Sequence, residues 1–542
     1  MIVVFVVSVG GTFVVKTISS EDIDKKDLNG LSNSSEVKGL KKSYIPTQDT
    51  INHKDNAKEI TGVNSYSADT KKNLSLHVYP QKVIRPINRL IYGSNLDPKT
   101  EFEMDVAKFG KDIGITNFRF PGGGSPGYHW KTGLSDFNER INTAPLANLK
   151  HLAEFFKITN AKLVIQVNIE SGTPREAADW VMVMNKTLGF PVQYWELGNE
   201  VYGDWDKAYM SAENYVKVIK EYSLAMKGVD PTIKIGIDIG GPNYDDFNKT
   251  VIKNAAGFFD FLSYHWYPNH TSPQKKYEDR EHPTAEVIMA NSLAVPQIVT
   301  HLKNLLTQNA PEVKDKIEIT FMEWDGSWDA ASSDLDFSYK GMMWSLSNAI
   351  FYADTLGEFA REGVSVANQF TFQEVMFGLI RGWDKEAGWG GSAWDQETVR
   401  PKALAMKLFA RHFGDTLIES RLDGSDGYVK KQDWRADSYT GNVPYVQAYA
   451  SKFSNANELA IVLTNKHQQE DFSIEIYLDD VDPETQAIVW VLNGPNLEAQ
   501  NDGKPRNVDI KESSINVDNK FQYVVPAHSV NLIAIKLKPT SQ

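Results

Sequence analysis

The sequence predicts an α/β protein: a (β/α)8 TIM barrel followed by a C-terminal β-sandwich domain. Eight short apolar runs alternate with amphipathic stretches over residues 89–414, which favours a catalytic barrel over an open sheet. Over residues 415–542, alternating apolar and polar segments are separated by Asn, Asp, Gly and Pro, a pattern typical of a β-sandwich. A chain of 542 residues is also too long for one compact core, so two structured domains are expected.

The predicted barrel strands are short and largely apolar, as buried parallel strands are. Two of the stretches that follow them begin with Pro, which suits the first turn of a helix. No Gly-x-Gly-x-x-Gly turn opens a helix, which disfavours a dinucleotide-binding sheet. The predicted strands are residues 90–95, 115–120, 162–168, 192–197, 233–238, 259–265, 317–323 and 367–372, and the predicted helices are 104–114, 145–159, 174–188, 212–228, 245–254, 291–310 and 338–362.

The N-terminal part of the chain is expected to target the protein for export instead of contributing to its core. Residues 1–19 are predicted to be a signal peptide or an N-terminal anchor, because an uncharged apolar run of signal-peptide length lies there, although no basic residue precedes it. Residues 20–73 are rich in Ser, Lys, Asp and Asn, which predicts a disordered leader. Residues 74–88 are strand-like and are expected to join the β-sandwich. The expected location is secreted, periplasmic or at the cell surface.

Composition excludes several function classes. The chain carries 57 Lys and Arg against 70 Asp and Glu, so its net charge of −13 disfavours nucleic acid as a partner. The absence of cysteine excludes disulfides, thiolate nucleophiles and Cys-ligated metals. No His-x-x-x-His or His-Glu-x-x-His spacing predicts a metal site, and no Gly-x-Ser-x-Gly turn predicts a serine nucleophile. No cofactor and no obligatory protein partner are expected, and the oligomeric state is not predicted.

Two glutamates follow or end predicted strands of the barrel. The strand at 192–197 is followed by Asn199-Glu200, and the strand at 317–323 ends in Glu323. Active sites of such barrels lie at the carboxyl ends of the strands. Retaining cleavage of a glycosidic bond needs two carboxyl groups about 5–5.5 Å apart. We therefore predict Glu323 as the nucleophile and Glu200 as the acid/base, with the nucleophile's charge keeping Glu200 protonated near neutral pH.

Other polar and aromatic residues near strand ends are candidates for contacts with a sugar. Asn199 is expected to hydrogen-bond a sugar hydroxyl, and Arg119 and Tyr267 to hold Glu323 ionised. His265 ends a strand and could either line the site or be a core histidine. Trp266 and Trp324, which lie beside these residues, are further candidates for sugar contacts, and residues 382–391 are expected to form a functional loop. One or two of four other indoles are expected to stack on sugar: Trp205, Trp328, Trp389 and Trp394. Five acids near strand ends are expected to be supporting or loop residues: Glu170, Asp204, Asp238, Asp325 and Glu374.

Several motifs resemble those of the clan A glycoside hydrolases and, within the clan, of family 51, the α-L-arabinofuranosidase family. They are FRFPGGGSPGYHWKTG at 118–133, NIESGTPREAADWV at 168–181, QYWELGNEVYGDW at 193–205, AMKGVDPTIKIG at 225–236, LSYHWY at 262–267 and FMEW at 321–324. The resemblance implies a retaining mechanism with Glu200 as acid/base and Glu323 as nucleophile. It also places Asn199, Arg119, Tyr267 and Gln373 near the sugar whose bond is cleaved.

The sequence departs from the family pattern at two places that would contact this sugar. The family has a Glu-His pair after its first strand, where this chain has Ser94, Asn95 and Leu96, and an Asn where this chain has Gly124. Lost polar contacts change which sugar a site accepts, so an altered −1 subsite with Asn95 as a contact is expected. The predicted substrate is a cell-wall or algal polysaccharide or its oligosaccharides, with endo action possible. A non-catalytic carbohydrate-binding protein and a transglycosylase are the alternatives.

Overall fold

The computed structural model divides the chain into two compact units, Met1–Ala57 and Lys58–Gln542. The structure describes residues 3–9, 12–18, 63–65, 74–96, 104–123, 127–135, 149–206, 208–269, 283–327, 342–374, 377–381, 399–431, 435–502 and 506–538.

The described part of the first unit is a β-hairpin. Strand β1 (Val3–Val9) pairs antiparallel with β2 (Thr12–Ile18). Both strands are rich in valine, a residue that favours extended backbone. This hairpin occupies the segment predicted as a signal peptide or anchor. The predicted leader at 20–73 lies outside the described residues, except for β3 (Val63–Ser65). Among the described residues, no helix combines the length and the apolar character that crossing a bilayer requires.

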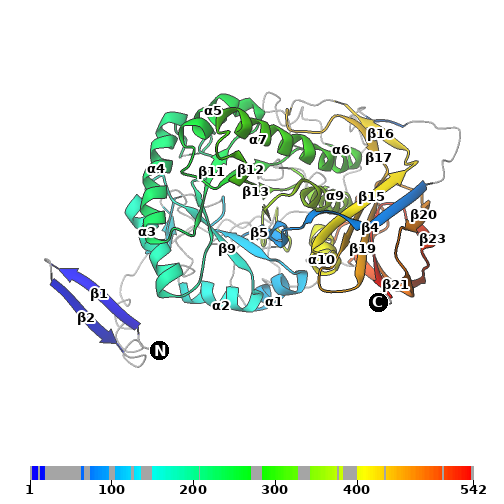
Figure 1. Ribbon diagram of the computed structural model, residues 1–542, viewed down its shortest axis with the longest axis horizontal. Coiled ribbons are helices and arrows are strands. Elements are labelled where there is room, and N and C mark those ends of the chain that lie inside the picture. The colour runs from blue at the N-terminus through cyan, green and yellow to red at the C-terminus, as the bar shows by residue number, and fades with distance from the viewer. Residues whose placement is uncertain are drawn as a thin grey trace, which may run out of the picture. The chain divides into compact units, whose positions relative to one another are not determined.

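Eight parallel strands close into a barrel in the second unit, with helices around its outside (Figure 1). The predicted fold class is therefore confirmed, and each predicted barrel strand overlaps an observed one. The strands follow chain order around the barrel, and β14 pairs with β5 to close it. They are β5 (Gly93–Asn95), β6 (Asn117–Phe120), β9 (Lys162–Val167), β10 (Tyr194–Leu197), β11 (Lys234–Ile239), β12 (Phe261–Trp266), β13 (Glu318–Trp324) and β14 (Val366–Gln369).

Hydroxyl side chains fix where several of the barrel helices begin. Thr173, Ser211 and Ser345 each accept a hydrogen bond from a backbone N–H in the first turn of α3, α4 and α9. The predicted helix at 174–188 continues past α3 as a π-helix, Met182–Thr187. The α-helices are α1 (Met104–Ile113), α2 (Leu149–Thr159), α3 (Pro174–Val181), α4 (Ala212–Val229), α5 (Asp245–Asn254), α6 (Ala285–Ala290), α7 (Val295–Asn309), α9 (Leu346–Glu362) and α10 (Pro401–His412).

A curled nine-stranded sheet follows the barrel, and one of its strands comes from before the barrel. Strand β4 (Leu74–Pro86) pairs antiparallel with β15 and parallel with β20, so it lies inside this sheet (Figure 1). The other strands are β15 (Thr416–Asp423), β18 (Val446–Lys452), β19 (Glu458–Asn465), β20 (Phe472–Leu478), β21 (Pro483–Asn493), β22 (Asp509–Asn516), β23 (Lys520–Val525) and β24 (Ser529–Leu537), and β16 (Gly427–Lys430) and β17 (Gly441–Pro444) form a smaller sheet with β3.

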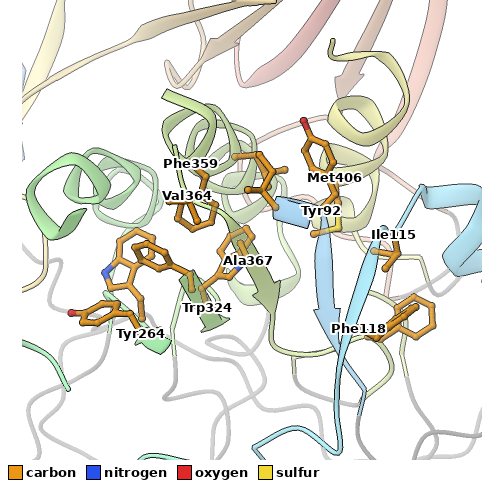
Figure 2. Packing of buried hydrophobic residues seen from close by; sticks show 14 of the residues in the cluster. Tyr92, Ile115, Phe118, Tyr264, Trp324, Phe359, Val364, Ala367 and Met406 are labelled. Atoms are coloured by element: carbon orange, nitrogen blue, oxygen red, sulfur yellow. The ribbon is translucent and has the colours of Figure 1, made fainter. Parts of the chain in front are cut away.

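One hydrophobic core runs through the barrel and reaches the face of the large sheet. Figure 2 shows part of it, including Phe118, Tyr264, Trp324 and Phe359. Polar contacts also cross between the barrel helices and the sheet domain: Lys466, for example, forms a 2.6 Å ion pair with Asp354 of α9, and Arg400 contacts Asp502. The barrel and the sheet domain therefore share a packed boundary, and the strand ends of the barrel rest on a continuous core.

Candidate active site

The guanidinium of Arg119 is the centre of the site. Arg119 lies on β6, is fully buried, and its side chain reaches residues of three other strands or the loops that follow them. It donates 2.5 Å from Nε to Glu196, 3.0 Å from Nη1 to Asn95, 2.7 Å from Nη1 to Glu323 and 2.8 Å from Nη2 to Asn199. Such a planar fork fixes several oxygens in one arrangement.

The structure brings Glu200 and Glu323 together at the carboxyl end of the barrel. A carboxyl oxygen of Glu200, a carboxyl oxygen of Glu323 and a ring nitrogen of His265 all lie within 4.8 Å of one another. This spacing fits the separation of about 5–5.5 Å that retaining glycosidases use, and it is shorter than the 6.5–9.5 Å or so of inverting enzymes. The two residues come from β13 and from the loop after β10.

Glu323 is held from two sides. Arg119 donates to its Oε1 at 2.7 Å, and the hydroxyl of Tyr267 donates to its Oε2 at 2.8 Å. Donors on both oxygens stabilise a carboxylate and fix its direction, which a nucleophile requires. Gly123 packs against the same carboxylate, because a Cβ on this residue would stand 2.0 Å from Oε1 of Glu323 and 3.2 Å from Oδ1 of Asn199. Only glycine fits beside the carboxylate at this position.

Glu200 follows β10 in an unusual backbone conformation and has two donors of its own. Its φ of 47° lies in the left-handed region, which is uncommon outside glycine and frequent at functional sites. The ring Nδ1 of His265 lies 3.0 Å from Oε1, and the indole N–H of Trp205 donates 2.7 Å to Oε2. Unlike buried Glu323, the side chain of Glu200 is 20% exposed, so it faces the opening of the site.

The charge state of Glu200 differs from the sequence prediction. Burial raises the pKa of its carboxyl, but the hydrogen bonds and charge of His265 and the donor of Trp205 outweigh burial and lower the pKa below its usual value. Burial alone would lower the pKa of His265, whereas Glu323, Glu196 and Glu200 together raise it to about 10. Both shifts favour a proton on the imidazole ring over one on Glu200 in the free protein. The sequence did not reveal the position of this ring between several carboxylates.

Two buried acids belong to the site: Glu196, which was not predicted, and Asp238, which was expected to be a supporting or loop residue. Glu196 is fully buried and accepts hydrogen bonds from Arg119 and Ser263. Burial raises its pKa, but Arg119 and His265 outweigh it, and the pKa falls to about 2. Asp238 on β11 is 1% exposed, and burial together with the charge of Glu196 raises its pKa well above the usual value. The sequence feature that could have placed both acids in the site is the alternation of side chains along a strand, because Glu196 and Asp238 stand at inward positions near strand ends.

The acids and His265 form two groups with the spacing of metal ligands. Atoms of Glu196, Asp238 and His265 lie within 4.8 Å of one another, as do atoms of Glu200, His265 and Glu323. However, the guanidinium of Arg119 stands among these carboxylates and already supplies a positive charge. The arrangement is thus an ion-pair network, and its chemistry is that of proton transfer and nucleophilic attack.

The geometry does not fit the predicted sugar contacts of Trp266 and Trp324. Both indoles are fully buried and point away from the lumen, because they follow the inward-pointing His265 and Glu323 by one residue. The Nε1 of Trp266 donates to the backbone oxygen of Asp437, and Trp324 packs among the core residues in Figure 2. They are core residues of the barrel wall.

Asn95 is also placed differently from the prediction. It is fully buried, its Oδ1 accepts from Arg119, and its Nδ2 donates to Met322 O at 2.9 Å and to two further backbone oxygens. Its amide therefore orients Arg119 rather than a sugar. Gln373 lies just after β14, on the side of the barrel where the site is, and is buried. Gly124, Trp328, Trp389, Trp394 and the predicted loop at 382–391 lie outside the described residues.

Trp205 is the exposed aromatic residue beside the acid/base candidate. Its residue is 59% exposed, and one face of the indole covers Gly203, where a Cβ would meet ring atoms at 2.3 Å. Tyr202 and Tyr244 contact the indole edge to face, each with a centroid distance of 6.0 Å. A ring supported in this way offers a fixed apolar surface next to Glu200, the group that would protonate a leaving group.

Comparison with known proteins finds similarity to the same family that the motifs resemble. The family model described as the α-L-arabinofuranosidase C-terminal domain matches residues 392–529. A probable α-L-arabinofuranosidase C from Aspergillus terreus is 24% identical over 524 residues, which cover 85% of this chain and 97% of the relative. An exo-α-(1→6)-L-arabinofuranosidase from Bifidobacterium longum is 23% identical, with 72% and 81% of the two chains covered.

Solved structures share the fold. The α-L-arabinofuranosidase from Thermotoga maritima, solved with arabinose, superposes with a TM-score of 0.69 at 23% identity, covering 86% of this chain and all of that one. A family 44 endoglucanase from Clostridium thermocellum gives a TM-score of 0.58 at 15% identity, with 86% of this chain covered. Identities this low show the fold alone, and the similarity to the family rests on the motifs, the C-terminal domain and the relatives together. The chain is therefore similar to family 51 of glycoside hydrolase clan A.

Proposed function

We propose that the protein is a retaining glycoside hydrolase that releases α-L-arabinofuranosyl units from the ends of polysaccharide or oligosaccharide chains. The observation that carries the hydrolase proposal is the pair Glu200 and Glu323, with carboxyl oxygens within 4.8 Å of each other at the open end of the barrel. The sugar and the exo action are proposed from the relatives, whose names describe arabinofuranosidases and, for two of them, exo action.

The geometry supports a double displacement. An oxygen of Glu323 attacks the anomeric carbon while Glu200 gives its proton to the glycosidic oxygen, so the bond to the leaving group breaks and an alcohol departs. Water then attacks the same carbon, Glu200 takes the proton of that water, and the bond to Glu323 breaks to restore its carboxylate. Arg119 and Tyr267 stabilise the leaving carboxylate of Glu323 in the second step.

Substitution of each glutamate tests this assignment. Glu323→Ala should abolish nearly all turnover of an aryl glycoside, and Glu200→Ala should reduce turnover by about 10²–10⁴-fold. Added azide should accelerate Glu200→Ala and yield a glycosyl azide of retained configuration, because azide needs no general base to attack the glycosyl-enzyme. Glu318→Gln is the matched control, since Glu318 lies at the other end of the same strand. Full turnover of Glu323→Ala would reject the proposal.

The same experiment addresses the two alternatives. A carbohydrate-binding protein would show no turnover that depends on Glu323, and its sugar affinity would survive Glu323→Ala. A transglycosylase would depend on both glutamates but would deliver the sugar to another sugar, so elongated products would appear at high substrate concentration.

A different sugar in the −1 subsite, with endo action on a cell-wall or algal glycan, is a second candidate. The observation that favours it is Asn95, whose amide is used entirely within the protein at the position where the family pattern predicts substrate contacts. A panel of aryl glycosides with plant and algal polysaccharides separates the candidates. Release of arabinose alone supports exo action on arabinofuranosides, and a ladder of oligosaccharides supports the second candidate.

We further propose that the protein is exported, because its expected substrates are extracellular polymers. Fractionation of cells that produce the full chain tests this: activity in the extracellular, periplasmic or surface fraction supports export, and activity confined to the cytoplasm rejects it.

A further inference from the structure

His265 stands between two pairs of acids. On one side of the imidazole, Nδ1 lies 3.0 Å from Glu200 and 3.6 Å from Glu323. On the other side, Nε2 lies 3.8 Å from Glu196, and atoms of Glu196, Asp238 and His265 are within 4.8 Å of one another. The ring therefore connects the two catalytic candidates with a second, fully enclosed pair of carboxyl groups beneath them.

Asp238 occupies an environment that opposes a negative charge. It is 1% exposed, and among the residues that the structure describes its Oδ2 has only a long contact of 3.5 Å from the N–H of Val201 and its Oδ1 has no hydrogen-bond partner. Ionised Glu196 stands beside it, and burial with this charge raises the pKa of Asp238 well above its ordinary value. The titratable and charged groups that face Asp238 are Glu196 on β10, His265 on β12, Arg119 on β6, Tyr202 after β10 and Tyr215 on α4.

The charges around His265 do not balance unless protons are shared. Four carboxyl groups, those of Glu196, Glu200, Asp238 and Glu323, are compensated by two cationic groups, Arg119 and the imidazolium of His265. A neutral Asp238 and a neutral Glu200 would remove the excess of negative charge from this buried region. Because Asp238 is the more enclosed of these two acids, it is the one that retains a proton in the free protein.

We propose that Asp238, held neutral beneath the site, is a positioning residue that allows His265 to pass its proton to Glu200, so that ionisation of Asp238 ends the acid step at alkaline pH. This inference rests on the proposed glycosidase function. The proton moves over the 3.0 Å contact: the N–H bond at Nδ1 breaks with its electrons left on nitrogen, and an O–H bond forms at Oε1 of Glu200. Glu200 then protonates the glycosidic oxygen.

The charge of Asp238 controls this transfer through the far side of the ring. With Asp238 neutral, only Glu196 attracts the positive imidazolium from that side, and the ring gives up its Nδ1 proton when substrate excludes water from Glu200. With Asp238 ionised, a second negative charge holds the imidazolium in its charged form. Glu200 then stays ionised and cannot protonate the leaving group.

The test is the pH dependence of kcat/KM, which reports the groups of the free enzyme. Asp238→Asn has the shape of a neutral aspartic acid and cannot ionise. Compared with the wild type, we expect the alkaline limb of the kcat/KM profile of this variant to move to higher pH by about one unit or more, which is a tenfold change in proton concentration. The acid limb should stay in place. Asp230→Asn is the matched control, because Asp230 is also a buried aspartate and lies shortly before β11, the strand of Asp238. This variant should leave both limbs of the pH profile unmoved. An alkaline limb of Asp238→Asn that stays in place or moves to lower pH would overturn the proposal.

A second measurement does not depend on activity. The infrared carbonyl stretch of a protonated carboxyl group should be present in the folded wild-type protein at neutral pH, absent from Asp238→Asn and retained in Asp230→Asn. In the wild type, this band should vanish over the same pH range in which activity is lost, a result that needs no variant to fold. Absence of the band at neutral pH would overturn the inference. A wild-type protein that shows the band but cleaves no glycoside would instead reject the proposed function.

Discussion

The indole N–H of Trp205 and the ring of His265 bind different oxygens of Glu200, with Trp205 donating to Oε2 over 2.7 Å. Both contacts stabilise the ionised form of this carboxyl, and together they lower its pKa against the opposing effect of burial. The acid/base candidate is therefore held in its basic form until substrate or a proton from His265 changes the balance.

Trp205→Phe should raise the pKa of Glu200, because phenylalanine keeps an aromatic ring but removes the donor. A higher pKa of Glu200 favours transfer of the proton from His265 to Glu200, so activity should persist to higher pH and the alkaline limb of kcat/KM should move upward, by less than one unit for a single exposed hydrogen bond. Trp490→Phe is the matched control, since Trp490 makes a similar 2.8 Å bond to Glu512 in the sheet domain. A downward shift in Trp205→Phe would contradict this assignment.

Trp205→Ala should separate substrates by their leaving groups. Loss of the exposed indole surface should lower kcat/KM about tenfold for oligosaccharides, since a stacking contact contributes on the order of 1 kcal/mol. A small aryl glycoside reaches less of this surface and should lose less activity. Parallel kinetics on both substrates provide the measurement, and equal losses on the two would count against a sugar platform at Trp205.

Gly123→Ala should damage catalysis more than stability. Its Cβ would stand 2.0 Å from Oε1 of Glu323, so the carboxylate must leave the position that Arg119 and Tyr267 fix. Displacement of a reacting group by about 1 Å can cost about 100-fold in rate. Steady-state kinetics should show this loss in kcat, while the melting temperature changes little. Gly228→Ala, where a Cβ meets nothing within 4 Å, should retain wild-type kinetics.

Arg119→Lys should be severely destabilising although it keeps the charge. A single ammonium group cannot replace the fork that binds Glu196, Glu323 and Asn199 at once. Incomplete compensation of buried carboxylates costs about 3–5 kcal/mol of the free energy of unfolding. Denaturant titration of the variant and the wild type measures this loss of unfolding free energy. The exposed pair of Arg421 with Asp423 provides the comparison, because Arg421→Lys should leave the unfolding midpoint unchanged.

Asp230→Asn should show a stability defect that depends on pH. Asp230 accepts bonds from Asn185, from the backbone and side chain of Thr232, and pairs with Lys186 at 3.0 Å. These donors outweigh burial and lower the pKa of Asp230 below its unfolded value of 3.8. The ionised form therefore stabilises the fold above about pH 4, and this contribution disappears as the pH falls further. Unfolding free energies of the variant and the wild type should differ by about 1–3 kcal/mol at pH 7 and converge in acid.

The barrel was predictable because each of its strands carries a local signal. A buried strand such as Lys162–Val167 is a short apolar run, and the stretches between strands repeat with helical spacing. Strand ends were less certain, and the segment at 367–372 shows why. The observed strand ends at Gln369, but Phe370 and Phe372 follow it in the loop, and these apolar residues extended the predicted strand to residue 372.

The meeting of Glu200 and Glu323 was also predictable, whereas the surroundings of this pair were not. A glutamate at the end of a parallel strand must lie at one rim of the barrel, so Glu200 and Glu323 could be placed together from the sequence. The direction of Trp324 depends on which residue of β13 faces inward, and a shift of one residue reverses it. The position of His265 among four acids depends on the closure of the barrel, which no single strand encodes.

Strand β4 leaves the ribosome before any barrel strand, yet its two neighbours in the sheet, β15 and β20, are synthesised more than 300 residues later. Until then its backbone N–H and C=O groups have no partners from this sheet, and such an unpaired edge can associate with other chains. Truncation before residue 416 therefore leaves β4 without either neighbour and the barrel without the strands of the sheet domain that pack on α9 and α10. Production of the barrel alone, without residues 415–542, should therefore give aggregated protein instead of a smaller active enzyme.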